Sequence, residues 1–146
     1  MRKINKQTGF TLIELIMVIV ILGVLSAFAL PRFADLGGQA RAATINGAAG
    51  SMKAAANIAH AQWLAVGSSP ASVTLEGTVV AMTFGYPTQA SILLAAQITA
   101  ADFDVATAGS VRATGATTIA NCSVSYTAAT SLTVPAVVGV PVTSGC

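Results

Sequence analysis

The sequence predicts an α+β protein in which a long N-terminal helix packs on a C-terminal antiparallel β-sheet. Three observations predict this class. Residues 10–30 form an apolar run, residues 32–66 are rich in alanine and lack proline, and beyond Pro70 the pattern changes to short segments rich in valine and threonine. Apolar residues at helical spacing indicate one long helix, and short β-prone segments separated by turn residues indicate strands.

The apolar run extends from Phe10 to Leu30, and Glu14 is its one charged residue. A helix of this length spans the hydrocarbon core of a bilayer. Residues 10–30 are therefore expected to form a transmembrane helix. A carboxylate inside such a helix is unfavourable, so its presence indicates a function. Three basic residues precede the run: Arg2, Lys3 and Lys6.

The helical pattern continues through residues 31–66 as an amphipathic half. One stripe of this segment contains Leu36, Ala40, Thr44, Ser51, Ala55 and Ile58, and a second contains Ile45, Ala49, Met52, Ala56, Ala59 and Trp63. Two stripes with this spacing predict a helix that packs a domain on one side and other helices on the other. Pro31 removes a backbone donor and crowds the preceding turn, which predicts a kink.

Residues 67–146 are expected to form a β-rich globular part. Segments 72–75 and 78–84, joined by Glu76-Gly77, predict a hairpin. Residues 88–100 predict a short helix with Thr88 as its cap. Further strands are expected at 118–126, 131–134 and 137–142. Pro135 and Pro141 place the last of these at a sheet edge, because proline cannot donate to a central ladder.

The segment G-F-T-L-I-E, from Gly9 to Glu14, follows a basic leader and opens the apolar run. It resembles the class III signal of type IV pilins and pseudopilins. The resemblance implies the pilin fold and a leader, residues 1–9, that a prepilin peptidase cuts between Gly9 and Phe10. It also implies N-methylation of Phe10. The segment from Pro31 to Arg41 and the motif Gly85-Tyr86-Pro87 are most similar to pilins of the mannose-sensitive haemagglutinin type.

Glu14 has a physical reason to lie in the apolar segment. Cleavage after Gly9 leaves a cationic amine on Phe10, and burying that amine without a partner is unfavourable. Glu14 is the only acid in the segment. It can pair with its own amine or with that of a neighbouring copy. The resemblance favours the neighbour, with Glu14 setting the register of assembly.

Two simpler explanations fit part of the N-terminal pattern. An ordinary secretory signal peptide has a basic start, an apolar stretch and a small-residue site such as Ala27-Phe28-Ala29. The apolar stretch of such a signal peptide is usually shorter than residues 10–30 and contains no acidic residue. A plain single-span anchor accounts for the length of the run, but not for Glu14 or for the Gly9–Phe10 junction.

The two cysteines are Cys122 and Cys146. An even number of cysteines in an exported domain predicts a disulfide. The alternatives are two buried thiols or a pair of metal ligands, but two cysteines without a nearby histidine make a poor zinc site. A C-terminal disulfide loop is also what the resemblance to type IV pilins implies.

The composition indicates a surface that is buried by other copies. Only 8% of the residues are charged, and the mean hydropathy is +0.75. This charge content is low for a free soluble protein. The leader holds three of the seven basic residues, so the basic balance of the precursor is poor support for a nucleic-acid surface. The aromatic residues are scattered and do not form a base-stacking surface.

No catalytic, metal or cofactor site is expected. His60 is the only histidine, and no nucleophile is paired with it by any catalytic pattern. A packing role is expected for it. Asp102 and Asp104 form D-x-D, but no further oxygen ligands follow at calcium-loop spacing. The chain is therefore expected to be structural and not an enzyme.

The resemblance implies a structural subunit that polymerises through its N-terminal helix into a type IV pilus for adhesion, motility or both. Its implied partners are copies of itself, the prepilin peptidase, an assembly ATPase, a platform protein and a secretin. The subunit would lie in the inner membrane before assembly and in an extracellular pilus afterwards. The alternatives are a major pseudopilin of a type II secretion system and a monomeric membrane-anchored binding module. The cysteine pair and the missing calcium loop are evidence against the pseudopilin. The low surface charge is evidence against the membrane-anchored binding module.

Overall fold

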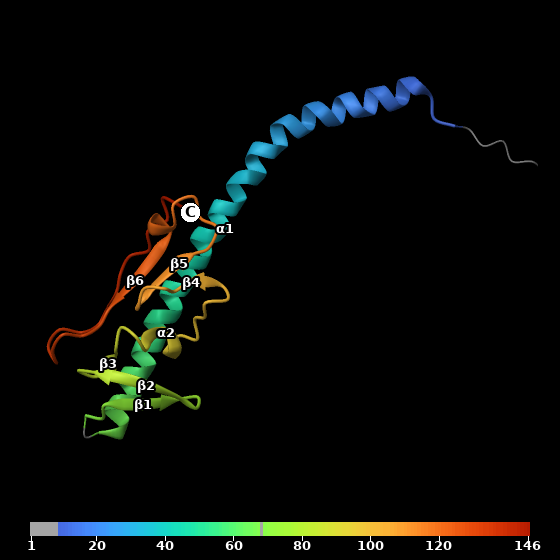
Figure 1. Cartoon of the computed structure of the whole chain (residues 1–146). Helices are drawn as coiled ribbons and strands as arrows, with labels where there is room; N and C mark the ends of the chain where they lie inside the picture. Colours follow the sequence, from blue (N-terminus) through green and yellow to red (C-terminus); the bar gives the residue numbers. More distant parts are fainter. Residues whose placement is uncertain (1–8, 68) are drawn as a thin grey trace, which may run out of the picture. The chain divides into compact units, whose positions relative to one another are not determined.

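The computed structural model describes residues 9–67 and 69–146, with the side chains of residues 30–35 excluded. Its elements are α1 (Leu12–Val66), β1 (Ser72–Leu75), β2 (Thr78–Thr83), β3 (Tyr86–Pro87), α2 (Ile92–Ala95), β4 (Phe103–Asp104), β5 (Ser110–Ala113), a 3-10 turn (Ile119–Asn121), β6 (Ser123–Thr127) and β7 (Val137–Val138) (Figure 1). The strands form two antiparallel sheets, β1-β2-β3 and β4-β5-β6-β7. The expected α+β class is confirmed. The chain divides into two compact units, with the boundary after Leu36.

In the N-terminal unit, α1 exposes apolar side chains all around its circumference. Residues Leu12–Ala29 have a mean hydropathy of 2.7 and, by length and composition, can cross a membrane. Their 18 residues extend about 27 Å as a helix, close to the thickness of a hydrocarbon core. The hydroxyl of Ser26 donates to the carbonyl oxygen of Leu22 at 2.7 Å, so it is satisfied inside the helix. A helix that is apolar on every side requires a lipid or protein environment.

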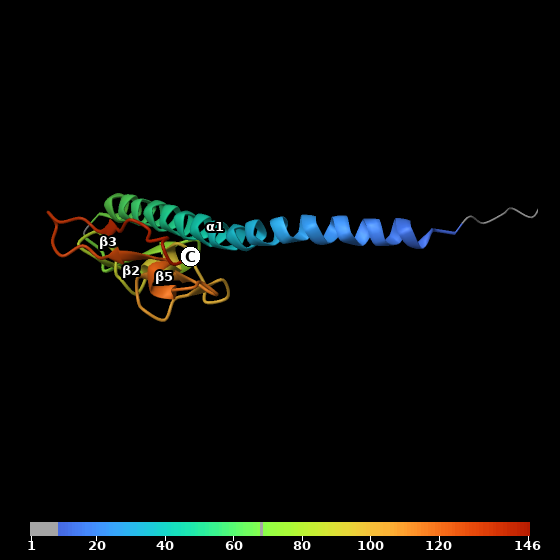
Figure 2. The same cartoon turned by 90° about the horizontal axis from the view of Figure 1, so that it is seen from above.

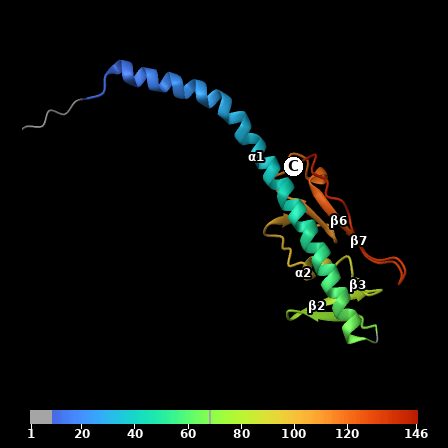
Figure 3. The same cartoon turned by 180° about the vertical axis from the view of Figure 1, so that it is seen from behind.

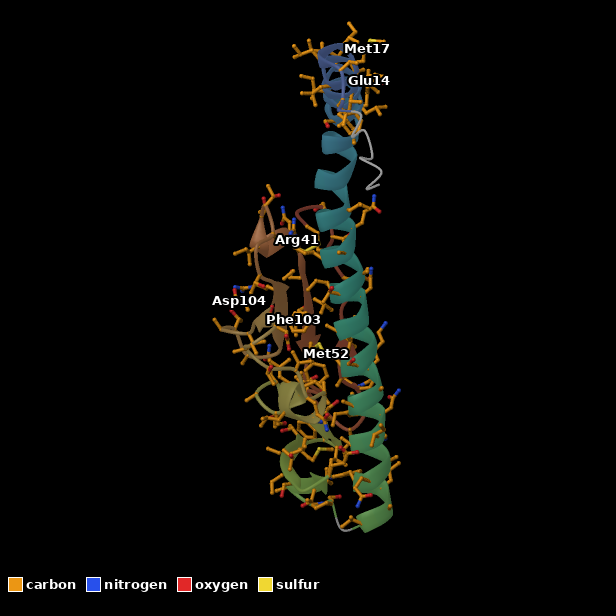
Figure 4. The ribbon with its side chains drawn as sticks, turned by 90° about the vertical axis from the view of Figure 1, so that its right-hand side faces the viewer. Glu14, Met17, Arg41, Met52, Phe103 and Asp104 are labelled. Carbon is orange, nitrogen blue, oxygen red and sulfur yellow. A yellow bond between two sulfur atoms is a disulfide. The ribbon has the colours of Figure 1, made fainter. Side chains whose placement is uncertain are left out.

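In the second unit, the two stripes of α1 have different surroundings. The stripe that contains Ile45 and Met52 is buried. Figure 4 shows the β elements along one side of this part of α1, with Met52 directed toward them. The other stripe is exposed apart from Ala55. The predicted packing of one stripe on the domain is therefore confirmed. α1 ends at Val66, and Gly67 follows with a φ of 69°.

Two groups of buried side chains hold the sheets to α1. The larger core contains Ile45, Met52, Ile92, Val111, Cys122, Val124 and Tyr126. The smaller core contains Ala59, Val73, Val80 and Met82, with Trp63 packed against it. Figure 2 shows both sheets on one side of this part of α1, and in Figure 3 the helix passes in front of them. Alanines at many of the helix positions in contact let the sheets approach closely.

Two tight turns shape the first sheet. Leu75 pairs with Thr78, so Glu76 and Gly77 form a two-residue loop, with φ values of 46° and 82°. Positive φ at both positions is the property of a type I′ hairpin turn. The predicted hairpin is confirmed. A second loop of the same kind, Phe84-Gly85, joins β2 to β3, with φ values of 50° and 84°.

The predicted helix at 88–100 is too long, because α2 covers only Ile92–Ala95. Gln97 adopts a φ of 54°. The N–H of Ile98 donates to the carbonyl oxygen of Leu93, and that of Gln97 to Leu94. These bonds form a Schellman motif, which stops a helix. Ser91, and not Thr88, is the residue that directly precedes α2. The Thr88 hydroxyl nevertheless accepts from the N–H of Ser91, three residues on, as an N-cap does, and so it caps the turn that leads into α2.

The expected strands of the C-terminal region are also corrected. The segment 118–126 begins as the 3-10 turn and becomes β6 only at Ser123. The reason is a pair of bonds to the chain end: Thr118 N–H donates to Gly145 O, and Gly145 N–H donates to Asn121 O. Residues 131–134 close a turn and do not form a strand. β7 covers two residues of the segment 137–142 and lies at a sheet edge.

The end of the chain is held by a disulfide and by a side chain of α1. Cys122, which is fully buried in the larger core, is bonded to Cys146. The Nε of Arg41 donates to the main-chain oxygen of Cys146 at 2.7 Å. Arg41 and the disulfide therefore connect the chain end to α1 and to the segment before β6. Figure 4 shows Arg41 on the sheet side of the helix.

Replacing Cys146 with serine is expected to lower the free energy of unfolding by about 3 kcal/mol, because the unfolded chain loses a crosslink. The crosslink joins residues 24 positions apart. Urea unfolding of the full-length subunit in detergent measures the change. Ser144→Ala is the matched control, since Ser144 is exposed nearby. Equal unfolding midpoints for Cys146→Ser and the native chain would contradict the expectation.

Candidate functional site

The N-terminus of α1 is closed by reciprocal hydrogen bonds between Thr11 and Glu14. The backbone N–H of Thr11 donates to Glu14 Oε2 at 2.9 Å, and the Thr11 hydroxyl donates to the same oxygen at 2.8 Å. The N–H of Glu14 in turn donates to Thr11 Oγ1 at 3.3 Å. This arrangement is a capping box, with Thr11 as the N-cap and Glu14 as the third helical residue.

The capping box fixes where the helix begins, and so it leaves the Gly9–Phe10 peptide bond outside the helix. Gly9, Phe10 and Thr11 have no regular secondary structure. The side chain of Phe10 is 94% exposed. Non-helical, exposed backbone of this kind is where proteolysis concentrates in proteins. The predicted cleavage position is therefore accessible, and the cleavage itself stays a prediction.

Thr11 was not identified as a functional residue from the sequence, although T-x-x-E before an apolar run is the signature of a capping box. In the uncleaved chain the Glu14 carboxylate already accepts two hydrogen bonds from Thr11. Both donors remain in the chain after cleavage at Gly9. The predicted pairing of Glu14 with a Phe10 amine would therefore have to compete with the cap or add to it.

The remaining predicted residues lie apart from this site. Cys122 and Cys146 belong to the second unit. The backbone at Pro31 is helical, but its side chain lies outside the described residues. The predicted kink at Pro31 stays a prediction.

His60 lies in a stack of aromatic side chains. Its ring is 4.3 Å from that of Tyr86 at an interplanar angle of 4°, and 6.1 Å from that of Trp63. Its Nδ1 lies 2.7 Å from the carbonyl oxygen of Gly85. A Cβ at Gly85 would lie 3.1 Å from this nitrogen, and Gly85 has a positive φ, so glycine fits the position best. The Gly85-Tyr86-Pro87 motif thus packs the second turn onto α1.

Tyr126 connects the two sheets. Its hydroxyl donates to the carbonyl oxygen of Pro87 at 2.7 Å. Burial, together with the nearby Tyr86 hydroxyl, raises the pKa of Tyr126 well above its ordinary value. A phenol that stays neutral and bonded in this way holds the sheets together and does not act as an acid or base near neutral pH.

The acidic residues of the second unit do not form a metal site. Asp104 accepts from the N–H of Ala106 and pairs with Arg112, whose guanidinium lies 3.6 Å away. Arg112 also donates to the Thr107 hydroxyl at 2.9 Å. Figure 4 shows Asp104 beside Phe103 at the outer edge of the domain. Among the described residues, no three histidine, cysteine or carboxylate side chains cluster as metal ligands.

Comparisons with known proteins find relatives of part of the chain. Residues 4–30 match the model of the prokaryotic N-terminal methylation motif. The chain is 49% identical over 57 residues to the type IV narrow pilus major component PilA5 of Thermus thermophilus, which is 39% of this chain and 49% of that protein. It is 56% identical over 32 residues to the type II secretion system core protein G of Vibrio cholerae, or 22% of each chain. No solved structure matches significantly.

The chain carries the methylation motif at the start of an apolar helix, as a type IV pilin or pseudopilin does. The motif is followed by a pilin-like arrangement of a long helix on antiparallel sheets. The match spans about half of the first relative's length and less of the second's.

Proposed function

We propose that the chain is a non-enzymatic subunit that polymerises into a type IV pilus. The methylation motif at the start of an apolar helix is the observation that carries this proposal. The first relative, a major component of a narrow type IV pilus, supports it over the matched segment. The exposed stripe of α1 in the second unit offers a further surface that other copies can cover.

The proposed path of the subunit follows from its N-terminus. A prepilin peptidase cuts between Gly9 and Phe10 and methylates the Phe10 amine. The apolar part of α1 then holds the subunit in the inner membrane. An assembly ATPase, a platform protein and a secretin move it into an extracellular fibre for adhesion, motility or both. The similarity of Gly85-Tyr86-Pro87 to pilins of the mannose-sensitive haemagglutinin type belongs to the same proposal.

A major pseudopilin of a type II secretion system is the second candidate, because the chain also resembles core protein G. Two features of the second unit oppose it. The chain end is fixed by the Cys122–Cys146 disulfide. Asp104, which a calcium loop would need, is instead paired with Arg112.

Expression of the full-length chain in a bacterium that has type IV pilus machinery but lacks its own major pilin tests the proposal. Surface fibres that contain the processed chain, seen by electron microscopy of sheared material, are the expected result. Fibres that form only with an overproduced type II secretion system would favour the pseudopilin. Processed subunits that stay in the membrane with either machinery would favour a monomeric anchored module and overturn the proposal.

A further inference from the structure

Lys53 is a cation that α1 exposes to solvent. The second unit holds three cationic side chains. Arg41 donates to the main-chain oxygen of Cys146, and Arg112 pairs with Asp104. Within the described part of the chain, the Lys53 ammonium has neither an ion pair nor a hydrogen bond. Gly50 and Ala54 lie beside it on the helix and are also exposed, so another chain can approach its backbone closely.

A groove lies on another side of the same part of α1. Its volume is about 250 Å³, and α1, the β1–β2 hairpin and α2 enclose it. Its lining includes Ile58, Gln62, Leu75, Glu76, Leu94 and Gln97. The side chains of Ile58 and Leu94 are more than half exposed there. The groove therefore combines an uncovered apolar floor with one carboxylate at its rim.

Glu76 has an unusual position in the hairpin. Its φ is 46°, in a turn that favours asparagine, aspartate or glycine at this place. Its Oε2 accepts a hydrogen bond from the Nε2 of Gln97 at 2.9 Å, and no described cation pairs with it. A residue kept in a disfavoured backbone conformation points to a use for its side chain. The bond from Gln97 holds the carboxylate over the groove.

A single copy cannot bring these two features together. Gln62 follows Lys53 by nine positions, which at about 100° per residue places it about 180° around the helix. By the same geometry Ile58 is about 140° away from Lys53. The body of α1 therefore separates Lys53 from the groove of its own subunit. A second copy can supply a lysine to the groove.

We propose that the groove of one subunit binds the Lys53 side of α1 from a second copy, with the Lys53 ammonium paired to Glu76. The opposite charges are complementary, and neither has an ionic partner among the described residues. The contact joins different surfaces of two copies, so it is heterologous and can repeat without closing, as a fibre requires. This inference rests on the proposed function and names one contact within that polymer.

Charge reversal in the full-length chain tests the contact. Lys53→Glu or Glu76→Lys places like charges together and is expected to lower the yield of sheared fibres about tenfold or more. The double variant restores opposite charges, and its yield is expected to return to within about twofold of the native chain. Asp102→Lys is the matched control, because Asp102 is exposed and lies outside the groove. It is expected to keep the yield and not to rescue Lys53→Glu.

The charge-reversal test requires that each variant accumulates in the membrane. Non-reducing gels of membrane fractions show whether each variant accumulates with its disulfide formed. Native yield from both single variants, or rescue of Lys53→Glu by Asp102→Lys, would overturn the contact. An absence of fibres from the native chain would instead refute the proposed function.

A crosslinking experiment covers the case in which a reversal variant does not accumulate. Fibres of a chain that carries both Lys53→Cys and Glu76→Cys are treated with a short bifunctional maleimide. A ladder of crosslinked multimers is expected from the double variant and none from either single variant, because each contact then holds only one thiol. The absence of a ladder from the double variant would also overturn the contact.

Discussion

Replacing Gly9 with leucine is expected to leave the leader attached and to abolish fibres. The structure separates this effect from any effect on folding. A Cβ at Gly9 meets no atom within 4 Å, and Gly9 does not use a positive φ. A side chain at this position therefore leaves the subunit itself undisturbed. The loss of cleavage would come from the peptidase, whose site must accept the residue before the cut bond.

Mass spectrometry of the membrane-bound subunit measures the result. The native chain is expected to begin with N-methyl-phenylalanine at Phe10, and Gly9→Leu is expected to retain Met1. Gly9→Ala is the graded control, since a single methyl group adds little bulk. Normal processing of Gly9→Leu would contradict the prediction. A mature chain that begins at Leu30 would show that an ordinary signal peptidase cuts after Ala29.

Replacing Glu14 with alanine is expected to give cleaved subunits that accumulate in the membrane but form more than about tenfold fewer fibres. The reason is the unpaired Phe10 amine, which an apolar fibre core would bury without a carboxylate. Membrane insertion should be normal, because the segment becomes more apolar. The ratio of fibre-bound to membrane-bound subunit measures the effect.

The capping box provides the controls for Glu14. Glu14→Gln keeps a side-chain oxygen that can cap Thr11 but removes the charge. Thr11→Val removes the hydroxyl from the cap and leaves the carboxylate. If the charge matters, Glu14→Gln assembles as poorly as Glu14→Ala, and Thr11→Val assembles well. The reverse pattern would show that the cap, and not the amine pairing, is the task of Glu14.

The parts of the fold that were predicted correctly depend on patterns among residues that are close together in the sequence. The spacing of Ile45, Met52 and Ala59 marked the buried stripe of α1, and Glu76-Gly77 marked the hairpin. The parts that were predicted wrongly show no such pattern. α2 ends at Ala95, earlier than predicted, because Gln97 takes a left-handed conformation although it is not glycine. The two-residue strands β3 and β4 are too short to show a period.

The same distinction holds for the candidate sites. Gly9, Phe10 and Glu14 lie in one continuous motif, so the sequence identifies them together. Thr11 lies in that motif too, and a search for the capping-box pattern would have found its role. The bond from Arg41 to Cys146 spans 105 positions and leaves no local pattern. Only the structure shows this hydrogen bond, because it requires the chain end to lie against α1.

The tethered chain end also has a mechanical consequence. In the proposed fibre, tension would pull on each subunit, and forced unfolding is governed by the rate of crossing the unfolding barrier. The disulfide closes a loop between residues 24 positions apart in the sequence. That loop would otherwise release about 80 Å of extended chain. While the bond is intact, Cys122 and Cys146 cannot be pulled apart under load. Reduction would therefore make the fibre more extensible before it breaks.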